Sequence, residues 1–232
     1  MRHVNLNVPL PDGLYRALRG LKRGLRPASG DTRDLSGDRE IEWSWVAAQI
    51  PPGPGEALDF GCGGSHLAIA AAHRGYRVTA VDLGPVEWPY HHERLSFLQG
   101  DILELDLGEG RFDLVLNCSS IEHVGLTGRY GVTKARPDGD LAAMARLRAL
   151  MKPGGLMLLT VPAGSDATFP PWHRVYGSGR LPRLLAGFAV ERSEFWLKNA
   201  ENRWASSDER TVVAAPSRER LYGLGCFALR RP

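Results

Sequence analysis

Hydrophobic and polar positions between residues 56 and 162 follow two patterns. Short apolar runs, which are typical of buried strands, occur together with segments whose apolar residues recur at helical spacing. The pattern predicts strands at residues 56–60, 77–82, 95–100, 112–118 and 156–162, and helices at residues 65–76 and 138–155. Strands separated by helices indicate a parallel sheet with helices on both faces, which is an α/β architecture.

The pattern changes after Pro162. A short helix is expected at residues 180–188, and strands at residues 188–198 and 222–231 follow with no helix predicted between them. Consecutive strands without a helical crossover favour an antiparallel hairpin. We therefore expect a mostly parallel sheet that is closed by a C-terminal antiparallel hairpin.

Residues 1–54 lack the alternation of strands and helices that begins at Glu56. They are interpreted as an N-terminal helical extension or cap, which leaves residues 55–232 as the main domain. Leucines recur at helical spacing within the basic residues 13–27, and a second helix is expected at residues 39–50. We expect the first helix to pack its leucines on the core, with an acidic partner or an anionic membrane surface as alternatives. Trp43 and Trp45 are expected in a packing seam, with a lid over a pocket as the alternative.

Composition excludes several classes of protein. With 43% hydrophobic residues and a net charge of +3, the chain is typical of a globular protein, and no nucleic-acid partner is expected. The three cysteines lack metal-ligand spacing, so no metal site is expected. Apolar runs of membrane-spanning length and the apolar core of a signal peptide are both missing, which predicts a cytoplasmic protein.

A glycine-rich turn joins the first predicted strand to the first predicted helix in the segment ALDFGCGGSH, residues 57–66. Such a turn places backbone N–H groups at a helix N-terminus, where a polar ligand can approach closely. A dinucleotide site needs a third glycine where His66 stands. Asp59 would repel a diphosphate and attract the cationic sulfonium or amino group of S-adenosylmethionine. The turn thus favours S-adenosylmethionine over a nicotinamide dinucleotide, with a purely structural turn as the remaining alternative.

Two further acids follow the second and third predicted strands. Asp82 ends the second strand, where a carboxylate can accept hydrogen bonds from the ribose hydroxyls of either cofactor. Asp101 follows the third strand and could accept a hydrogen bond from an adenine amino group while Ile102 packs on the ring. Turn or cap roles are the alternatives for both aspartates.

Together these residues resemble the class I S-adenosylmethionine-dependent methyltransferases. The resemblance runs from Glu56 to Pro162 and is carried by Asp59-x-Gly61-x-Gly63, Asp82, Gly100-Asp101, the strand FDLVLNC and the segment MKPGGLMLLTVP. It implies a Rossmann-like fold with a seven-stranded sheet, one strand of which is inserted antiparallel. It also implies that the cofactor is bound by Asp59, Gly61, Cys62, Gly63, Asp82, Leu83, Asp101, Ile102 and the backbone around Asn117 and Cys118.

A narrower resemblance involves SSIEHVGLTGRYG, residues 119–131, and HRVYG, residues 173–177. Both segments are similar to motifs of a poorly characterised subgroup of methyltransferase-like proteins, I-E-H-x-G-L-G-R-Y-G after the fourth strand and H-R-x-Y after the fifth. Thr127 interrupts the first pattern. This resemblance implies an acceptor connected with polysaccharide or sugar modification.

The acceptor is expected at the carboxyl ends of the fourth and fifth strands, where open α/β sheets bind ligands. Methyl transfer to a hydroxyl group needs a base. His123 is the first candidate, with Glu122 orienting it or acting as base itself, and His173 is the next candidate. Side chains that could bind an anionic or sugar-like acceptor, or serve only as anchors for their loops, are Arg129, Tyr130, Arg174 and Tyr176.

The sequence therefore predicts an S-adenosylmethionine-dependent methyltransferase that acts on a small polar acceptor, by O-methylation of a sugar, glycan precursor or related metabolite. Two alternatives stay open. One is a non-catalytic module that binds S-adenosylmethionine for regulation or as a scaffold. The other, less favoured, is a nicotinamide-dependent oxidoreductase.

Overall fold

The computed structural model describes residues 32–128 and 130–232. The basic helix predicted at residues 13–27 and the candidate acceptor ligand Arg129 lie outside the described residues. Residues Arg33–Pro232 form one compact unit, which includes the helix predicted at residues 39–50. The division of the chain at residue 54 stays a prediction.

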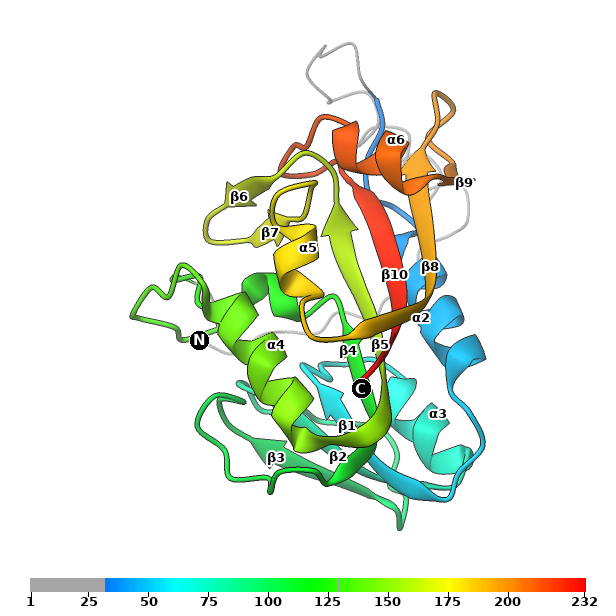
Figure 1. Cartoon of the computed structure of the whole chain (residues 1–232), viewed down its shortest axis with the longest axis vertical. Helices are drawn as coiled ribbons and strands as arrows, with labels where there is room; N and C mark the ends of the chain where they lie inside the picture. Colours follow the sequence, from blue (N-terminus) through cyan, green and yellow to red (C-terminus); the bar gives the residue numbers. More distant parts are fainter. Residues whose placement is uncertain (1–31, 129) are drawn as a thin grey trace, which may run out of the picture. The chain divides into compact units, whose positions relative to one another are not determined.

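The described residues of this unit are built around an eight-stranded sheet in the order β3, β2, β1, β4, β5, β10, β8, β9 (Figure 1). β1 to β5 are mutually parallel, and β10 runs antiparallel to its neighbours β5 and β8. The predicted parallel sheet and its closing C-terminal hairpin are confirmed. The strands are β1 Gly55–Phe60, β2 Tyr76–Asp82, β3 Leu95–Gln99, β4 Phe112–Cys118, β5 Met151–Ala163, β8 Ala189–Lys198, β9 Trp204–Ser207 and β10 Gly223–Arg230.

The sheet differs from the expected one at its edge. β9 pairs antiparallel with β8 and adds an eighth strand where the resemblance implies seven. Its sequence, WASS, contains no apolar run, so hydrophobic patterning carries no signal for it. A separate two-stranded sheet of β6 Ala167–Phe169 and β7 His173–Val175 is also missing from the prediction.

Lys198 at the end of β8 and Trp204 at the start of β9 anchor the segment that leads into α2 (Asp38–Gln49). Lys198 donates hydrogen bonds to the carbonyl oxygens of Ser36 at 2.6 Å and Asn202 at 3.0 Å. Trp204 Nε1 donates to the same Ser36 carbonyl oxygen at 3.1 Å. These bonds hold the start of α2 against the edge of the sheet.

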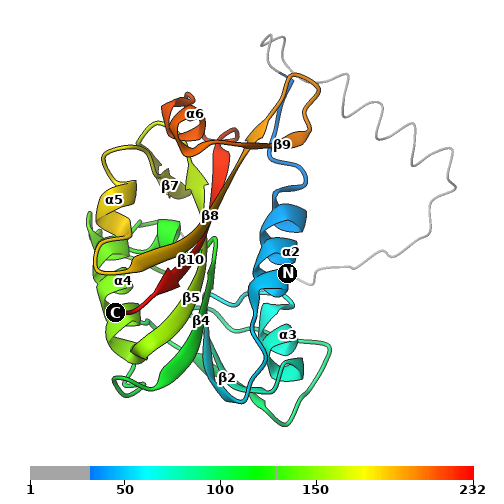
Figure 2. The same cartoon turned by 45° about the vertical axis from the view of Figure 1, so that its right-hand side comes forward.

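Helices cover both faces of the sheet, as Figure 2 shows. α2 and α3 (Leu67–His73) pack on one face, and α4 (Gly139–Leu150) and α5 (Leu181–Leu184) pack on the other. Another short helix, α6 (Glu209–Ala214), lies between β9 and β10 in the chain. None of the helices in the described ranges is long and apolar enough to cross a membrane.

Each face of the sheet has its own hydrophobic core, because successive side chains of a strand point to opposite faces. On β5, Leu156 and Leu158 belong to the core under α2 and α3, whereas Met157 and Leu159 belong to the core under α4. This alternation makes β5 apolar throughout its second half, as expected of a strand that is covered on both sides.

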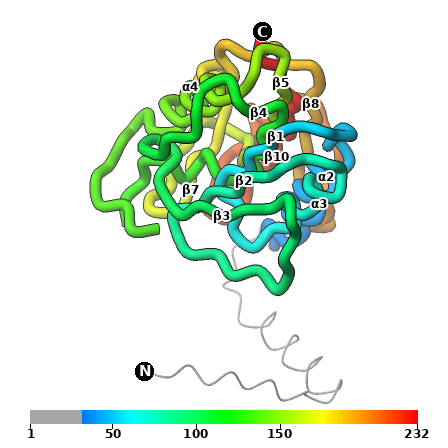
Figure 3. Tube along the Cα trace, turned by 90° about the horizontal axis from the view of Figure 1, so that it is seen from below, coloured from blue at the N-terminus to red at the C-terminus, as the bar shows by residue number. Residues whose placement is uncertain are grey.

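Figure 3 shows β3, β2, β1 and β4 side by side. Because these strands are parallel neighbours, their carboxyl ends lie together at one end of the sheet. The glycine turn follows β1, and the segment that begins with Ser119 follows β4. The topology thus brings the two motifs to the same place, although they are far apart in the sequence.

Candidate active site

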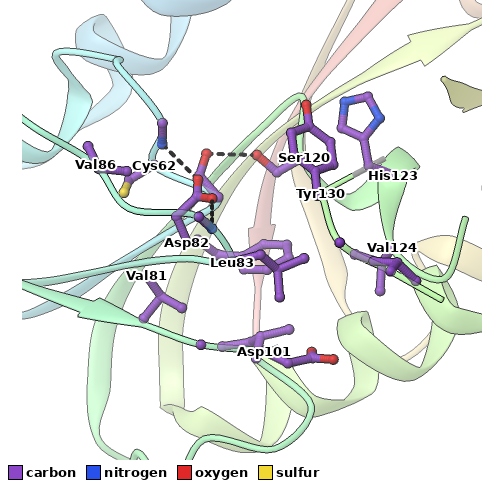
Figure 4. Close-up of a pocket in the computed structure, with 18 of the residues that line it drawn as sticks. Cys62, Val81, Asp82, Leu83, Val86, Asp101, Ser120, His123, Val124 and Tyr130 are labelled. Atoms are coloured by element: carbon purple, nitrogen blue, oxygen red, sulfur yellow. Dashed lines mark hydrogen bonds between the residues drawn. The ribbon is translucent and has the colours of Figure 1, made fainter. Parts of the chain in front are cut away.

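A cavity of about 1010 Å³ opens at the carboxyl ends of β1 to β4. The loops after these strands form its wall together with two side chains of α2. Figure 4 shows Asp82 and Leu83 facing Ser120 across it, with the rings of His123 and Tyr130 beside each other. The predicted cofactor ligands that line the cavity are Gly61, Cys62, Gly63, Asp82, Leu83, Asp101, Ile102 and Cys118.

The turn after β1 depends on glycine. Gly61 has a φ of 67° and Gly63 a φ of 45°, in the left-handed region that side chains disfavour. A Cβ atom on Gly61 would lie 2.3 Å from Ser120 Oγ, so the turn packs directly on the segment after β4. A Cβ atom on Gly63 or Gly64 would meet no atom within 4 Å, and both residues line the cavity. The turn therefore leaves bare backbone exposed to a ligand.

Two aspartates present their carboxylates to the cavity. Asp82 Oδ2 accepts a hydrogen bond from Gly63 N at 3.0 Å, and Oδ1 accepts one from Gly84 N at 3.1 Å. Asp101 Oδ1 accepts a hydrogen bond from Leu103 N at 2.9 Å. Each carboxylate oxygen has a second lone pair, so both side chains are fixed in place and can still accept from a ligand.

Asp59 lies behind the glycine turn instead of lining the cavity, and its side chain is only 2% exposed. Burial and, to a smaller extent, the Asp82 charge raise the pKa of Asp59 to about 7, although a hydrogen bond from the Ala68 N–H lowers it. Its Oδ2 has no hydrogen-bond partner among the described residues. From this position the charge of Asp59 can act on a ligand through the turn, and its role in cofactor binding stays a prediction.

Asn117 is also buried and does not line the cavity. Its amide nitrogen lies 3.7 Å from the sulfur of Met144. The next residue, Cys118, is the one that reaches the wall at this point of β4.

The short helix η1 (Ile121–His123) carries two predicted catalytic residues. His123 lines the cavity and Glu122 is buried beside it, with His123 Nε2 3.6 Å from Glu122 Oε1. His123 Nδ1 contacts the carbonyl oxygen of Trp172. Because a carbonyl oxygen only accepts, this contact assigns the proton of the neutral imidazole to Nδ1 and the lone pair to Nε2. The ring of Tyr130 lies 5.6 Å from the imidazole, centre to centre.

Three other candidates are buried and do not line the cavity, so His173 as a base and Arg174 and Tyr176 as acceptor ligands stay predictions. β7 lies against the end of β5, and its side chains point into the core. The His173 ring packs 4.9 Å from that of Tyr222. Arg174 donates to backbone carbonyl groups, and the Tyr176 hydroxyl donates to Asp140 at 3.1 Å.

α2 supplies part of the cavity wall through two residues that the sequence analysis does not list as ligands. Arg39 and Trp43 line the cavity one helical turn apart, whereas Trp45 is buried in the core. Trp43 thus lies where the lid alternative places it, and Trp45 lies in a packing seam. In the sequence, the i, i+4 spacing of Arg39 and Trp43 indicates that both side chains lie on the same face of a helix. Other wall residues that the prediction omits are Ser119, Ser120, Lys134 and Arg136.

Another buried acid, Glu42, lies on α2 between Arg39 and Trp43. It accepts hydrogen bonds from Arg39 at 3.1 Å, from the Thr160 hydroxyl at 3.0 Å and from the Ser119 hydroxyl. Burial raises the pKa of Glu42 to about 7, although the Arg39 charge and the hydrogen bonds lower it. Glu42 therefore links α2 to the ends of β4 and β5.

The chain is similar in sequence to known proteins over most of its length. A ubiquinone biosynthesis O-methyltransferase of Xanthomonas campestris pv. campestris is 30% identical over 190 residues, which cover 75% of this chain and 73% of that protein. A Bacillus subtilis protein named "Putative methyltransferase YqeM" is 27% identical over 216 residues, which cover 82% of this chain and 80% of that protein. The family described as "Caenorhabditis protein of unknown function, DUF268" matches residues 95–206.

A solved structure shares the fold. The 1,6-didemethyltoxoflavin-N1-methyltransferase of Burkholderia thailandensis, with bound 1,6-didemethyltoxoflavin and S-adenosylhomocysteine, superposes with a TM-score of 0.58. The match covers 98% of this chain and 93% of that one at 22% identity.

The chain belongs to the class I S-adenosylmethionine-dependent methyltransferases. It is an enzyme whose cofactor is S-adenosylmethionine, and the predicted Rossmann-like fold is confirmed. The bare backbone at Gly63 and Gly64 and the carboxylate of Asp82 fit that cofactor. The nicotinamide-dependent and non-catalytic alternatives are set aside.

The buried carboxyl group of Asp59 predicts a pH dependence of stability. Its pKa of about 7 lies above the ordinary value of 3.8, so the folded protein keeps a proton that the unfolded chain releases between these values. The free energy of unfolding should therefore fall as pH rises through this window, by up to about 1.4 kcal/mol per pH unit for this one group.

We expect Asp59→Asn to flatten that dependence, measured by urea unfolding across the window. Asp106→Asn, which changes an exposed aspartate, serves as the matched control. Glu42 contributes a dependence of the same sign in both proteins, so a residual slope is expected. A slope in Asp59→Asn as steep as in the wild type would contradict the assignment.

Proposed function

We propose that the enzyme methylates a hydroxyl group of a small polar acceptor, a sugar or related metabolite, with His123 as the base. The observation that carries the proposal is the His123 imidazole on the cavity wall, oriented by the contact of its Nδ1 with the Trp172 carbonyl oxygen. An oxygen acceptor must lose a proton as it gains a methyl group, and an imidazole accepts protons near neutral pH. The name of the Xanthomonas relative, an O-methyltransferase, supports oxygen as the acceptor atom.

The adenosine part of the cofactor would lie along the loops after β2 and β3. Asp82 would accept hydrogen bonds from the ribose hydroxyls, since both of its oxygens are held by backbone N–H groups and keep a lone pair. Asp101 would accept from the adenine amino group, and the apolar side chains of Leu83 and Ile102 would pack on the ring.

The methionine part would face the turn of residues 61–63 and the backbone at Cys118. Arg39 lines the same cavity and brings a guanidinium group that suits the carboxylate of the cofactor. α2 would then act as a cap over this end of the cavity, which is the role expected for the N-terminal extension.

S-adenosylmethionine, when bound, supplies a methyl group that is attached to a cationic sulfur. This sulfur is a good leaving group because it departs as a neutral thioether. What the protein adds is alignment of the acceptor and removal of its proton. His123 would accept that proton on Nε2 while the Trp172 carbonyl oxygen keeps the ring oriented. The carboxyl group of Glu122, 3.6 Å from Nε2, would stabilise the imidazolium that forms.

Tyr130 is the candidate that supports a sugar-like acceptor. It is 48% exposed and lies beside His123 at the cavity wall, where its ring offers a face for stacking and its hydroxyl a hydrogen-bond partner. Arg129, the adjacent residue, stays a predicted acceptor ligand from its sequence position. A cytoplasmic location also stays a prediction.

The ribose assignment predicts that Asp82→Ala weakens binding of S-adenosylhomocysteine by about 1–3 kcal/mol, because the hydroxyls lose a charged acceptor. Isothermal titration calorimetry measures this directly. Asp106→Ala, an exposed aspartate outside the cavity, should bind like the wild type. Unchanged affinity in a folded Asp82→Ala variant would remove Asp82 from the site.

The mechanism predicts that His123→Ala lowers the rate of methyl transfer by about 10²-fold or more with little change in S-adenosylhomocysteine affinity. The rate is measured with methyl-labelled S-adenosylmethionine against a panel of sugars, sugar nucleotides, phenols and amines. His91→Ala, an exposed histidine outside the cavity, is the control. Transfer only to amines, or a normal rate in His123→Ala with saturating acceptor, would refute the proposal.

A further inference from the structure

Arg174 is a charged side chain in an unusual environment. It is 2% exposed, yet all the nitrogen atoms of its guanidinium group face oxygen atoms. Nη1 donates to the carbonyl oxygens of Glu122 at 3.2 Å and Val124 at 2.7 Å. Nη2 donates to those of Arg136 at 3.3 Å and Pro137 at 3.2 Å. A guanidinium group has five N–H donors in a fixed plane. Here Nη1 and Nη2 together donate to the carbonyl groups of four different residues.

The four carbonyl groups lie at the two ends of one loop. Glu122 and Val124 precede it and flank His123, whereas Arg136 and Pro137 follow it. The ends are in direct contact, since Arg136 N donates to the Gly125 carbonyl oxygen at 2.9 Å. A Cβ atom on Gly125 would lie 2.3 Å from the Arg136 carbonyl oxygen. The base of the loop is therefore closed tightly, and Arg174 supplies hydrogen-bond donors to buried and partly buried carbonyl groups there.

The same loop forms part of the cavity wall. Tyr130, Val132, Lys134 and Arg136 all line the cavity, as does His123 just before the loop. The position of these groups relative to the glycine turn thus depends on what holds the base of the loop.

We propose that Arg174 is a positioning residue, whose guanidinium group fixes the turn that carries His123 and the loop over the cavity. The inference rests on the proposed function for the role of His123, but the placement of the loop does not depend on it. It also explains why the two motifs of the sequence, residues 119–131 and residues 173–177, belong together. The second motif holds the first in place from inside the core.

A buried acid anchors Arg174 in turn. Asp140, on α4, is fully buried, and its Oδ1 lies 3.8 Å from Arg174 Nε. Asp140 also accepts hydrogen bonds from Tyr176 at 3.1 Å and from Arg180 Nε at 2.9 Å. Burying a guanidinium group is costly unless it is paired and hydrogen-bonded, so the charge of Asp140 offsets this cost. The ammonium group of a lysine could keep that charge but not reach four peptide groups at once.

The test is hydrogen–deuterium exchange of the full chain, with and without S-adenosylhomocysteine, in wild type, Arg174→Gln and Arg174→Lys. We expect exchange of the amides in residues 121–126 and 131–136 to rise by about tenfold or more in Arg174→Gln, since these segments would open without unfolding the sheet. Arg174→Lys should show a smaller rise in the same segments. The His123 imidazole resonances should move in both variants, which a role confined to overall stability would not produce.

The matched control is Arg231→Gln. Arg231 also donates to backbone carbonyl groups, those of Ala149 and Met151, but outside the cavity wall. Its loss should leave exchange of the loop and the His123 signals unchanged. Wild-type exchange of the loop in a folded Arg174→Gln variant, or an equal rise in Arg231→Gln, would overturn the proposal. If Arg174→Gln does not fold, Arg174→Lys decides by the same criterion. The exchange experiment uses no methyl acceptor, so its result does not depend on whether the proposed O-methylation is correct.

Discussion

The close approach of Gly61 to Ser120 is the contact on which the site depends. β1 and β4 are parallel neighbours, so the turns that follow them leave the sheet side by side. There is no room between them for a side chain at residue 61, and Ser120 Oγ donates to the Gly61 carbonyl oxygen at 3.1 Å. This contact joins the part of the cavity that suits the cofactor to the part that carries His123. Methyl transfer requires that alignment, because the acceptor must approach the methyl carbon from the side opposite the sulfur, which leaves as a thioether.

Two buried carboxyl groups behind the cavity add an electrostatic contribution to the site. Asp59 on β1 and Glu42 on α2 are both buried, and burial raises the pKa of each to about 7. Near neutral pH each group is therefore balanced between its neutral and charged forms. A cationic ligand in the cavity favours the charged forms, whereas a diphosphate would favour the neutral ones. Cofactor binding and proton release at these two groups are thus linked.

Much of this could be predicted from the sequence because the signals are local. Apolar runs indicate the strands of the parallel sheet, and the Gly61 turn, with Asp59 before it and His66 in place of a third glycine, favours S-adenosylmethionine as the cofactor. Arg174 and Tyr176 could not be assigned in this way, since arginine and tyrosine suit both a ligand and a buried hydrogen-bond network, and only the tertiary structure shows which carbonyl groups they meet. Arg39 could not be identified because it reaches the cavity from α2, and the position of this helix depends on packing against α3, β4, β5 and β10 that no local pattern encodes.

The most direct test of the central claim is the affinity of Gly61→Ala for S-adenosylhomocysteine, measured by calorimetry beside Gly154→Ala. Gly154 also has a positive φ, 76°, but a Cβ atom there would meet nothing within 4 Å and the residue lies outside the cavity wall. Both variants should lose stability through backbone strain, of about 1–2 kcal/mol. Only Gly61→Ala should also lose affinity, by about tenfold or more, because Ser120 must move and the turn with it. Wild-type affinity in a folded Gly61→Ala variant would contradict the account.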